Sequence, residues 1–499
     1  MSLSQLPREL RDTIYDYYTS ENGGYYFDPR EGKLRTLCGD KIDLSLMYTC
    51  KSFAAEMRGV PFRNNTIHFT TSPSPDRYNR DYRHFGHLLE RLYAIKIMTL
   101  SQARPFITDE IARKTIQSFP HFATLIRHLR TSKAEECGLH EQLGRSVEWG
   151  SAPSVHHDAI AELLSMVAQN PAFGQAIREE LFDHGCEIRD GQDVLSLYSL
   201  RPKPWCAPNA HEIQTMVQHM PSYRHPSIDE RVRDQTRYSV SAASLASEFL
   251  STLTQRSRSS IRHLELHELH ASFAYSECHA RALIPFVIEN PKLKIVRRVD
   301  LWNNVLASQH LRDFEWRRYI CSKGRTPIGD MDADEVTRTL ALWLTEALAL
   351  EPAGMPPKTF SLAFQGEKDS MQPIFDILLE DASWQAALEK FPGKEIGSVD
   401  ELERSGTGYR GFSSYFFDEL PELMRHIING TAPVTFDYCS GLVWDVRNIL
   451  TMNNTCHGMA DWNKKWRSLR YRKVTPSLPH TWQTILENYV CKDEEARSM

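Results

Sequence analysis

The densest group of side chains that could bind a metal lies between residues 263 and 279. It comprises His263, His267, His270, Cys278 and His279. Imidazole and thiolate groups are ligands that zinc prefers in proteins. A strand over 261–266 would place His263 on the opposite face from Leu264 and Leu266, because successive strand residues point to opposite sides. The spacing of the five side chains matches no zinc module, so we expect the chain to hold no metal ion and no cofactor.

A second candidate is the run His156-His157-Asp158. Adjacent residues of a helix point about 100° apart, so the two imidazoles and the carboxylate could not share one face. The first turn of a helix explains the run better, because an aspartate there interacts favourably with the helix dipole. We therefore interpret these residues as the start of a helix.

No complete catalytic motif is present in the sequence. Gly393-Lys394 lacks the upstream glycine and the following serine or threonine of a phosphate-binding loop. Gly406, Gly408 and Gly411 have the spacing of a dinucleotide-binding loop, but they follow a charged stretch instead of an apolar strand. A flexible loop is the better interpretation of these glycines. We predict no catalytic residue, and an enzyme is the least favoured class of function.

The segment 464–473 carries six basic residues in ten, interleaved with Trp466 and Tyr471. One interpretation is a patch that binds nucleic acid or an acidic partner. The other is a solvated basic segment whose charge is balanced by acidic surface elsewhere. We favour the second, because basic residues at several adjacent positions cannot all face one groove.

The composition is that of a folded protein. The 499 residues are 41% apolar and 25% charged, and the formal net charge is −5. The length predicts two to four compact units, and the small net charge argues against a strongly basic nucleic-acid binder. No apolar run approaches the ~18 residues of a membrane span, and the N-terminus lacks a secretory pattern. The ten cysteines include no Cys-x-x-Cys pair, so we expect reduced thiols and a cytoplasmic and/or nuclear location.

The elements that would position these side chains begin with a predicted N-terminal domain over residues 1–75. Its expected elements are a helix over 6–18, a hairpin over 25–37, a helical region over 43–58 and a strand over 65–71. Pro7 suits the first helical position, where its missing N–H would be unpaired in any case. A Pro-rich break at 71–75 ends the domain.

Helical patterns dominate the body, residues 76–499. The predicted helices cover 85–100, 108–117, 155–169, 172–183, 209–219, 241–255, 278–289, 333–350, 371–390, 415–429, 442–453 and 479–490. The clearest is 333–350, where Asp332 and Glu335 form a capping-box pattern. Polar, glycine-rich or proline-rich stretches make 221–240 and 392–411 the candidate points of subdivision.

A short apolar pattern with basic residues recurs in the body at 125–130, 261–266 and 293–299. Its alternating apolar residues favour strands, and each stretch follows a helical pattern. Helix–strand units are therefore expected. The spacing of the three stretches is uneven, so they do not predict a regular repeat solenoid.

Two N-terminal stretches together resemble the F-box motif. The first is Leu6-Pro7-Arg8-Glu9-Leu10 followed by Ile14, and the second runs from Asp43 to Phe53 and contains Tyr48-Thr49-Cys50-Lys51. With Glu56-Met57-Arg58-Gly59, the whole run looks like that of fungal F-box-like proteins of uncharacterised function. One departure is a hairpin of ~20 residues between the two helical parts, where the standard module is compact.

The resemblance implies a three-helix module that docks on the Skp1 adaptor of a cullin ubiquitin ligase, while the rest of the chain presents a substrate. The residues that it assigns to partner binding are Leu6, Pro7, Leu10 and Ile14 on the first face, and Leu44, Leu46, Cys50 and Phe53 on the second. A competing interpretation is that these side chains form a small core that packs the N-terminus onto the body.

The sequence as a whole predicts an α+β fold that is predominantly α-helical. It would consist of a small F-box-like helical head with a hairpin insertion, then a large helical body with a few short strands. The expected function is protein interaction, with a Skp1-like adaptor and an unknown protein substrate as partners. The alternative is a structural or regulatory binding protein without a ligase role. Neither nucleic acid nor a membrane is an expected partner.

Overall fold

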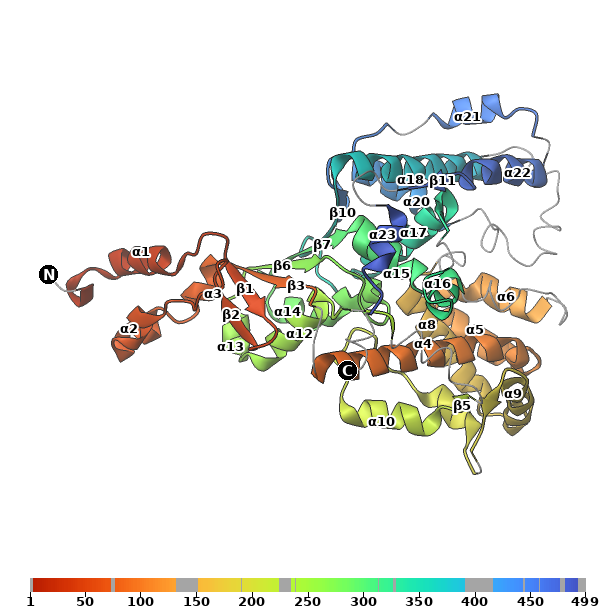
Figure 1. Cartoon of the computed structure of the whole chain (residues 1–499), viewed down its shortest axis with the longest axis horizontal. Coiled ribbons are helices and arrows are strands. Elements are labelled where there is room, and N and C mark those ends of the chain that lie inside the picture. The colour runs from red at the N-terminus through yellow and green to blue at the C-terminus, as the bar shows by residue number, and fades with distance from the viewer. Residues whose placement is uncertain are drawn as a thin grey trace.

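The structure is a computed structural model of the chain, and it is mainly helical with one large sheet (Figure 1). It describes residues 3–72, 77–131, 151–189, 191–223, 235–237, 239–312, 314–325, 329–390, 416–442, 445–456, 458–475 and 481–491. The candidate point of subdivision at 392–411, with its glycines, lies outside the described residues, as does most of 221–240.

The large sheet has seven strands in the order β10-β9-β7-β6-β3-β1-β2. They are β1 (Tyr25–Asp28), β2 (Lys33–Arg35), β3 (Thr66–Thr70), β6 (His263–Glu268), β7 (Lys294–Asp300), β9 (Phe360–Gln365) and β10 (Val434–Phe436). All neighbouring strands are parallel except β1 and β2, which form an antiparallel hairpin. Two small sheets pair β4 (Cys186–Glu187) with β5 (Ser222–Tyr223), and β8 (Met331–Asp332) with β11 (Lys473–Val474).

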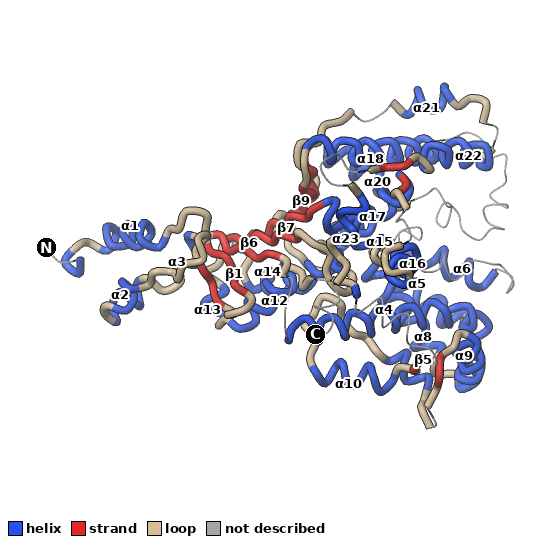
Figure 2. The backbone as a smooth tube through the Cα atoms, viewed as in Figure 1, coloured by secondary structure: helices blue, strands red, loops and turns tan. Residues whose placement is uncertain are grey.

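From β3 to β10, each later strand of the large sheet is added at the same edge, so the strands form one row (Figure 2). Stacked helix–strand units produce this order. The strands β6, β7, β9 and β10 begin at residues 263, 294, 360 and 434, so their separations are irregular. The α-rich α+β prediction is confirmed, but the sheet is larger than the few short strands that were expected.

Helices make up most of the rest of the described chain. In the first half of the chain they are α1 (Arg8–Thr19), α2 (Lys51–Glu56), α3 (Val60–Asn64), α4 (Arg77–Ala103), α5 (Asp109–Ser118), α6 (Ala123–Thr131), α8 (Pro153–Val167), α9 (Pro171–Asp183), α10 (Ala210–His219), α12 (Ala242–Thr252) and α13 (Gln255–Arg258). In the second half they are α14 (Ile284–Glu289), α15 (Ala307–His310), α16 (Phe314–Cys321), α17 (Ala333–Ala349), α18 (Lys368–Glu389), α20 (Leu420–Ile428), α21 (Val446–Met452), α22 (Met459–Arg470) and α23 (Trp482–Glu487). The predicted helices of the body thus correspond to helices of the structure, with shifted ends, except that the first half of 278–289 belongs to the 3₁₀ helix η7 (Ser276–Leu283) and the second half to the short α14.

Of the three stretches expected to be strands, two are strands and one is not. The stretches at 261–266 and 293–299 correspond to β6 and β7, whereas 125–130 lies in α6. The buried apolar residues of α6, Leu125, Ile126 and Leu129, have the spacing of a helix face, which explains the error. The predicted capping box of 333–350 is present at Asp332 and Glu335.

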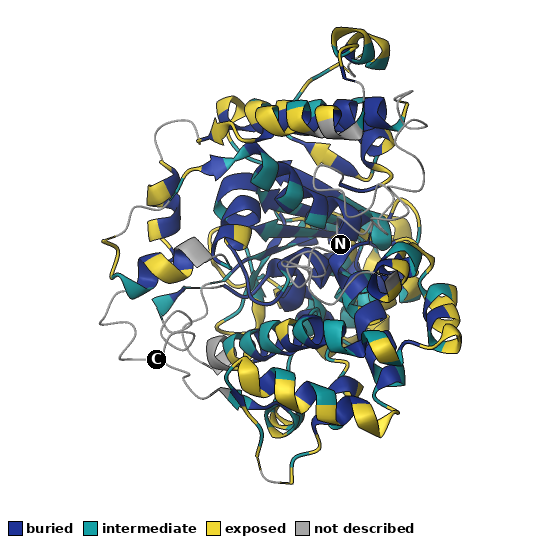
Figure 3. Ribbon diagram, turned by 90° about the vertical axis from the view of Figure 1, so that its right-hand side faces the viewer, coloured by how far each residue is buried: buried dark blue, intermediate teal, exposed yellow. Residues whose placement is uncertain are grey.

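One face of the sheet carries the core, which the colouring of Figure 3 shows as a buried interior. Ile67, Leu264 and Ile295 belong to one apolar cluster, which α4, α8 and α12 also join. Val299 and Phe364, on the same face, belong to a second cluster with residues of α17, α18 and α22. Two buried charged residues, Glu268 and Arg297, lie on this face as well, because they follow the inward alternation of β6 and β7.

The carboxylate of Glu268 and the guanidinium of Arg297 form an ion pair at 2.8 Å, and both side chains are almost fully buried. The carboxylate also accepts backbone hydrogen bonds at the start of α12, from Ala242 N and Ala243 N. Arg297 donates to the carbonyl oxygens of Ser276 and Glu277, and it lies over the ring of Trp343 of α17 at 4.8 Å. Every charged atom therefore has a partner, which is the condition under which a protein interior accepts charges.

A second buried polar group connects α17, α18 and α22. Asp381 of α18 accepts hydrogen bonds from the Thr337 hydroxyl at 2.6 Å and from the indole N–H of Trp466 at 2.8 Å. Trp466 and Arg470 of the basic segment 464–473 are buried. The preference for a solvated segment is therefore wrong for this part, because α22 directs its aromatic residues inward while Lys464 and Arg467 remain exposed.

The buried ion pair leads to a first prediction. We expect Glu268→Gln and Arg297→Met each to lower the free energy of unfolding by about 3–5 kcal/mol, because each leaves the other group buried without its partner. The double variant should cost clearly less than the sum of the two single costs. Urea unfolding of the four full-length proteins measures this coupling. Strictly additive costs would show that the two groups do not act as a pair.

The second prediction concerns pH. Burial raises the pKa of Asp381 to about 7. In the unfolded chain this carboxyl loses its proton near pH 4, so between about pH 4 and 7 the folded protein binds more protons and stability falls as pH rises. Asp381→Asn removes this loss, since an amide can accept from Trp466 and donate to Thr337.

We therefore expect the Asp381→Asn variant to melt at a higher temperature than the parent at about pH 8, with a difference that shrinks toward about pH 4. Thermal melting of both proteins across this range measures the difference. A constant difference at all pH values would contradict a raised pKa.

Candidate functional site

The first candidate site is the N-terminal head, which comprises α1, the 3₁₀ helix η2 (Ser45–Tyr48), α2 and α3. The head projects beyond the edge of the large sheet, away from most of the body (Figure 1). Its own core is small, with Tyr15, Met57 and Val60 buried. The hairpin of β1 and β2 pairs with β3 and so belongs to the sheet.

One face of α1 packs against α2 through polar groups. Arg11 donates two hydrogen bonds to the carboxylate of Glu56, each at 2.9 Å, and the Tyr15 hydroxyl donates a third at 2.8 Å. The hydrogen bonds from Arg11 and then Tyr15 lower the pKa of Glu56 to about 2. This charged pair joins the two helices while the Tyr15 ring fills the head's core.

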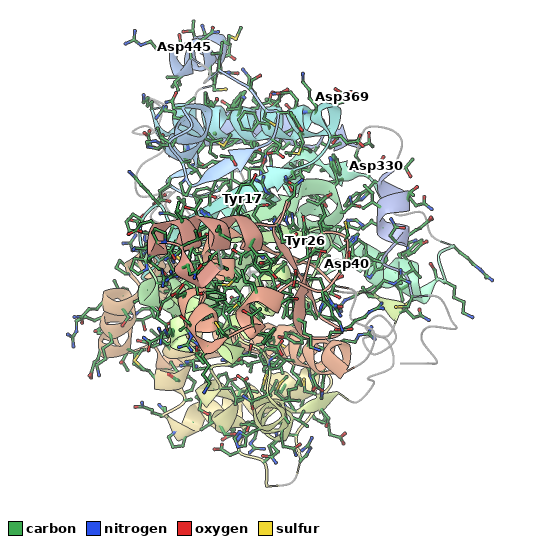
Figure 4. All side chains as sticks on the ribbon, turned by 90° about the vertical axis from the view of Figure 1, so that its left-hand side faces the viewer. Tyr17, Tyr26, Asp40, Asp330, Asp369 and Asp445 are labelled. Carbon is green, nitrogen blue, oxygen red and sulfur yellow. The ribbon has the colours of Figure 1, made fainter. Side chains whose placement is uncertain are left out.

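The other face of α1 presents apolar side chains to solvent. Leu10, Ile14 and Tyr17 are spaced by four and three residues, which places them on one side of the helix. They are 52%, 38% and 89% exposed, and Tyr48 of η2 is 82% exposed. Figure 4 looks onto this end of the molecule and labels Tyr17. A surface helix normally turns its apolar side inward, so this outward stripe is an unusual arrangement.

The structure places the other predicted partner-binding residues as follows. Leu6 is half-buried and Pro7 is exposed, and Pro7 precedes α1 as its N-cap instead of occupying the first helical position. Leu44, Leu46 and Phe53 are half-buried, and the latter two pack against the head's core. Cys50 is exposed and caps α2, where its sulfur accepts from Phe53 N at 3.4 Å. The expected helical region over 43–58 consists of η2 and α2.

The second candidate site is on the large sheet, on the face opposite the core, which we call the open face. Here Tyr26 of β1, His68 of β3 and Glu265 of β6 lie in register on three neighbouring strands. His267 is two residues after Glu265 and so shares its face, and Arg298 of β7 lies beside His267.

Three of these residues place ligand atoms close together. His68 Nδ1 and His267 Nε2 are 3.1 Å apart, and each lies 3.6 Å from Glu265 Oε2. Their side chains are between 12% and 26% exposed, so the group is accessible from the open face. Arg298 Nε lies 3.4 Å from the same carboxylate oxygen. The Tyr26 ring, also on the side shown in Figure 4, stacks on the His68 ring with centroids 4.5 Å apart.

Burial sets the charge state of the two imidazoles. It lowers the pKa of His68 and of His267, although the Glu265 carboxylate acts in the opposite direction on both. Both rings are therefore neutral at pH 7, and a neutral imidazole has a nitrogen lone pair that can bind a metal ion.

Of the histidines and the cysteine grouped by sequence, His267 alone joins this cluster among the described residues. His263 lies exposed at the start of β6, on the face that the strand prediction gave it. Cys278 and His279 are buried, and His279 bonds to Ser241 and to the carbonyl of Ala274. Burial lowers the pKa of His279 to about 3. These two residues are part of the core.

The run His156-His157-Asp158 lies in α8, as its helical interpretation expected, but α8 begins at Pro153 and has no acidic residue in its first turn, so the expected interaction of Asp158 with the first turn is not found. Asp158 lines a small pocket with Lys96 of α4, which the sequence analysis did not single out. The Lys96 ammonium donates to the carbonyl of Leu200 at 2.8 Å, and burial lowers its pKa to about 7. Lys96 is buried on the inward side of α4, among the apolar residues of that helix.

Comparison with known proteins identified no relative of this chain: no protein-family model, no curated protein and no solved structure matched it. Within the described part of the chain, no helix combines the length and the apolar character needed to cross a membrane.

The two faces of α1 lead to a third prediction. We expect the double change Leu10→Ala and Ile14→Ala to alter the stability of the head by less than about 0.5 kcal/mol, because both side chains are exposed and alanine favours a helix. Tyr15→Ala should cost about 3 kcal/mol or more, because it empties the head's core. Hydrogen exchange of the α1 amides measures both effects. Equal losses of protection would show that the outward stripe contributes to the packing of the head.

Proposed function

We propose that the protein is a protein-interaction adaptor whose head docks on a Skp1-like adaptor of a cullin ubiquitin ligase, while the body holds a protein substrate. The observation that carries this proposal is the apolar stripe of Leu10, Ile14 and Tyr17 on the outward face of α1.

The first support is energetic. Exposed apolar side chains grouped on one helix mark surfaces that bind other proteins, because burying them in a partner removes apolar area from water. Anchors at positions i, i+4 and i+7 suit a helix that fills a groove between partner helices. The resemblance of Leu6–Leu10 and Asp43–Phe53 to the F-box motif suggests that the partner with this groove is a Skp1-like protein.

The second support is the way the head is mounted. Arg11, Tyr15 and Glu56 fix α1 against α2 on the inner side, so the outer stripe is held without using its apolar side chains. The hairpin insertion pairs with the sheet through β3 and leaves Leu10 and Tyr17 exposed. The insertion that distinguishes this chain from a compact F-box module therefore does not bury the proposed docking face.

The fourth prediction tests this proposal. The intact protein, mixed at ~50 μM with a recombinant Skp1-like adaptor, should co-elute with it in size-exclusion chromatography. The double variant Leu10→Ala and Ile14→Ala should bind at least about tenfold more weakly, which corresponds to about 1.4 kcal/mol, because a few buried anchors dominate such interfaces. This pair is preferable to Leu6 and Pro7, which are half-buried or form the N-cap of α1.

A matched control is available on the body. Leu442 and Met452 are 85% and 74% exposed, so Leu442→Ala with Met452→Ala removes similar apolar groups away from the head. This control should bind like the parent. Absence of co-elution with the intact chain would reject the ligase-adaptor role and leave a structural or regulatory binding protein. Equal binding by the parent and the α1 variant would reject α1 as the docking face.

A further inference from the structure

The open-face cluster has the dimensions of a metal-binding site. The triangle formed by His68 Nδ1, His267 Nε2 and Glu265 Oε2 has sides of 3.1, 3.6 and 3.6 Å, and its centre is about 2.0 Å from each corner. Zinc bonds to imidazole nitrogen and to carboxylate oxygen have this length. An ion at or just above the plane of the triangle would thus reach all three atoms without movement of the backbone.

The surroundings of His68 suit a metal ligand. Its Nδ1 faces the cluster, and the ring is also hydrogen-bonded to the backbone of Gly23. Metal-binding histidines are commonly oriented by a hydrogen bond of the ring to the backbone or to a carboxylate. Tyr26 covers one face of the ring.

Apart from one short contact, the contacts within the group are long. The two neutral imidazoles can share one proton across their 3.1 Å contact, but both then lie 3.6 Å from the carboxylate, beyond ordinary hydrogen-bond distance. The contacts of Arg298 with Glu265 are also long, at 3.4 and 3.5 Å. A divalent cation between the three atoms would replace these weak contacts with three direct bonds.

We propose that His68, Glu265 and His267 form a zinc-binding site on the open face of the sheet. Two imidazoles and one carboxylate are a ligand set that zinc accepts, and three protein ligands leave a fourth position for water or for a group of an incoming molecule. The site connects β3, which follows the head in the chain, to β6 of the body. Binding of the ion therefore ties the sheet edge that carries the head to the rest of the sheet. This proposal replaces the expectation of a metal-free chain and is independent of Skp1 binding.

Calorimetric titration with Zn²⁺ tests the proposal, using the full-length, tag-free protein after treatment with a chelator. We expect about one Zn²⁺ to bind per chain and the melting temperature to rise, because an ion that binds only the folded state stabilises it. His68→Gln and His267→Gln should each weaken binding by about tenfold or more. Arg298→Gln should strengthen it, since it removes a positive charge beside the carboxylate.

His263→Gln is the matched control, because His263 is an exposed imidazole on the same strand and face outside the cluster. It should leave zinc binding unchanged. Melting of each variant in the absence of zinc checks that it is folded, and Glu265→Gln serves as an additional ligand variant. No saturable binding by the parent, full binding by the His68→Gln and His267→Gln double variant, or an equal loss in His263→Gln would overturn the proposal. Co-elution with a Skp1-like adaptor does not depend on any of these outcomes.

Discussion

The ion pair between Glu268 and Arg297 sets the arrangement of the elements around it. Two charges can lie inside a protein only if their hydrogen-bonding atoms are all occupied, and the partners here come from five elements. These are β6, β7, the start of α12, the start of the 3₁₀ helix η7 at Ser276–Glu277 and the Trp343 ring of α17. Moving β6, β7, α12 or η7 would take a hydrogen-bond partner away from one of the two charged groups, and moving α17 would remove the ring that covers Arg297. The pair therefore favours one arrangement of these elements on the sheet.

The same pair also fixes the strand register on which the open face depends. A slip of one residue between β6 and β7 would turn Arg297 away from the core, and the full set of side chains on that strand would change face. In the observed register, the inward positions of β6 are occupied by Leu264, Leu266 and Glu268, so Glu265 and His267 must point outward. The buried charges therefore determine the position of the candidate zinc ligands although they do not contact them.

The two proposed surfaces lie on different elements, one on α1 of the head and the other on β3 and β6 of the sheet. The stripe on α1 is apolar and exposed, and α1 itself packs on the small core of the head. An exposed apolar helix of this kind suits insertion into a partner's groove. The cluster on β3 and β6 is polar, rigidly supported by paired strands, and suits a small cation. Because β3 follows the head directly in the chain, an ion bound there would stabilise the strand that connects the head to the sheet, without contacting Leu10 or Ile14. The surfaces could thus act in the same molecule without competing for residues.

Local patterns were sufficient to predict most helices, the N-terminal hairpin, the strands β3, β6 and β7, and the capping box at Asp332 and Glu335. Such features depend on residues within a few positions of each other, so their signals are complete in a short stretch of sequence. The outward stripe of α1 was visible in the same way as a four-residue spacing. The sequence did not show that this stripe faces solvent, because the same spacing is equally compatible with a buried helix.

The proposed zinc site and the buried ion pair depend on contacts that no short stretch contains. His68 and His267 are separated by 199 residues, and they meet because β3 pairs with β6. Glu268 and Arg297 each occupy an inward position of an alternating strand. In the sequence, a charged residue at such a position conflicts with the apolar pattern, and only the tertiary structure shows the partner that neutralises it. Strand order, register and the burial of charge are set by the balance of contacts across the whole molecule, so they emerged with the tertiary structure.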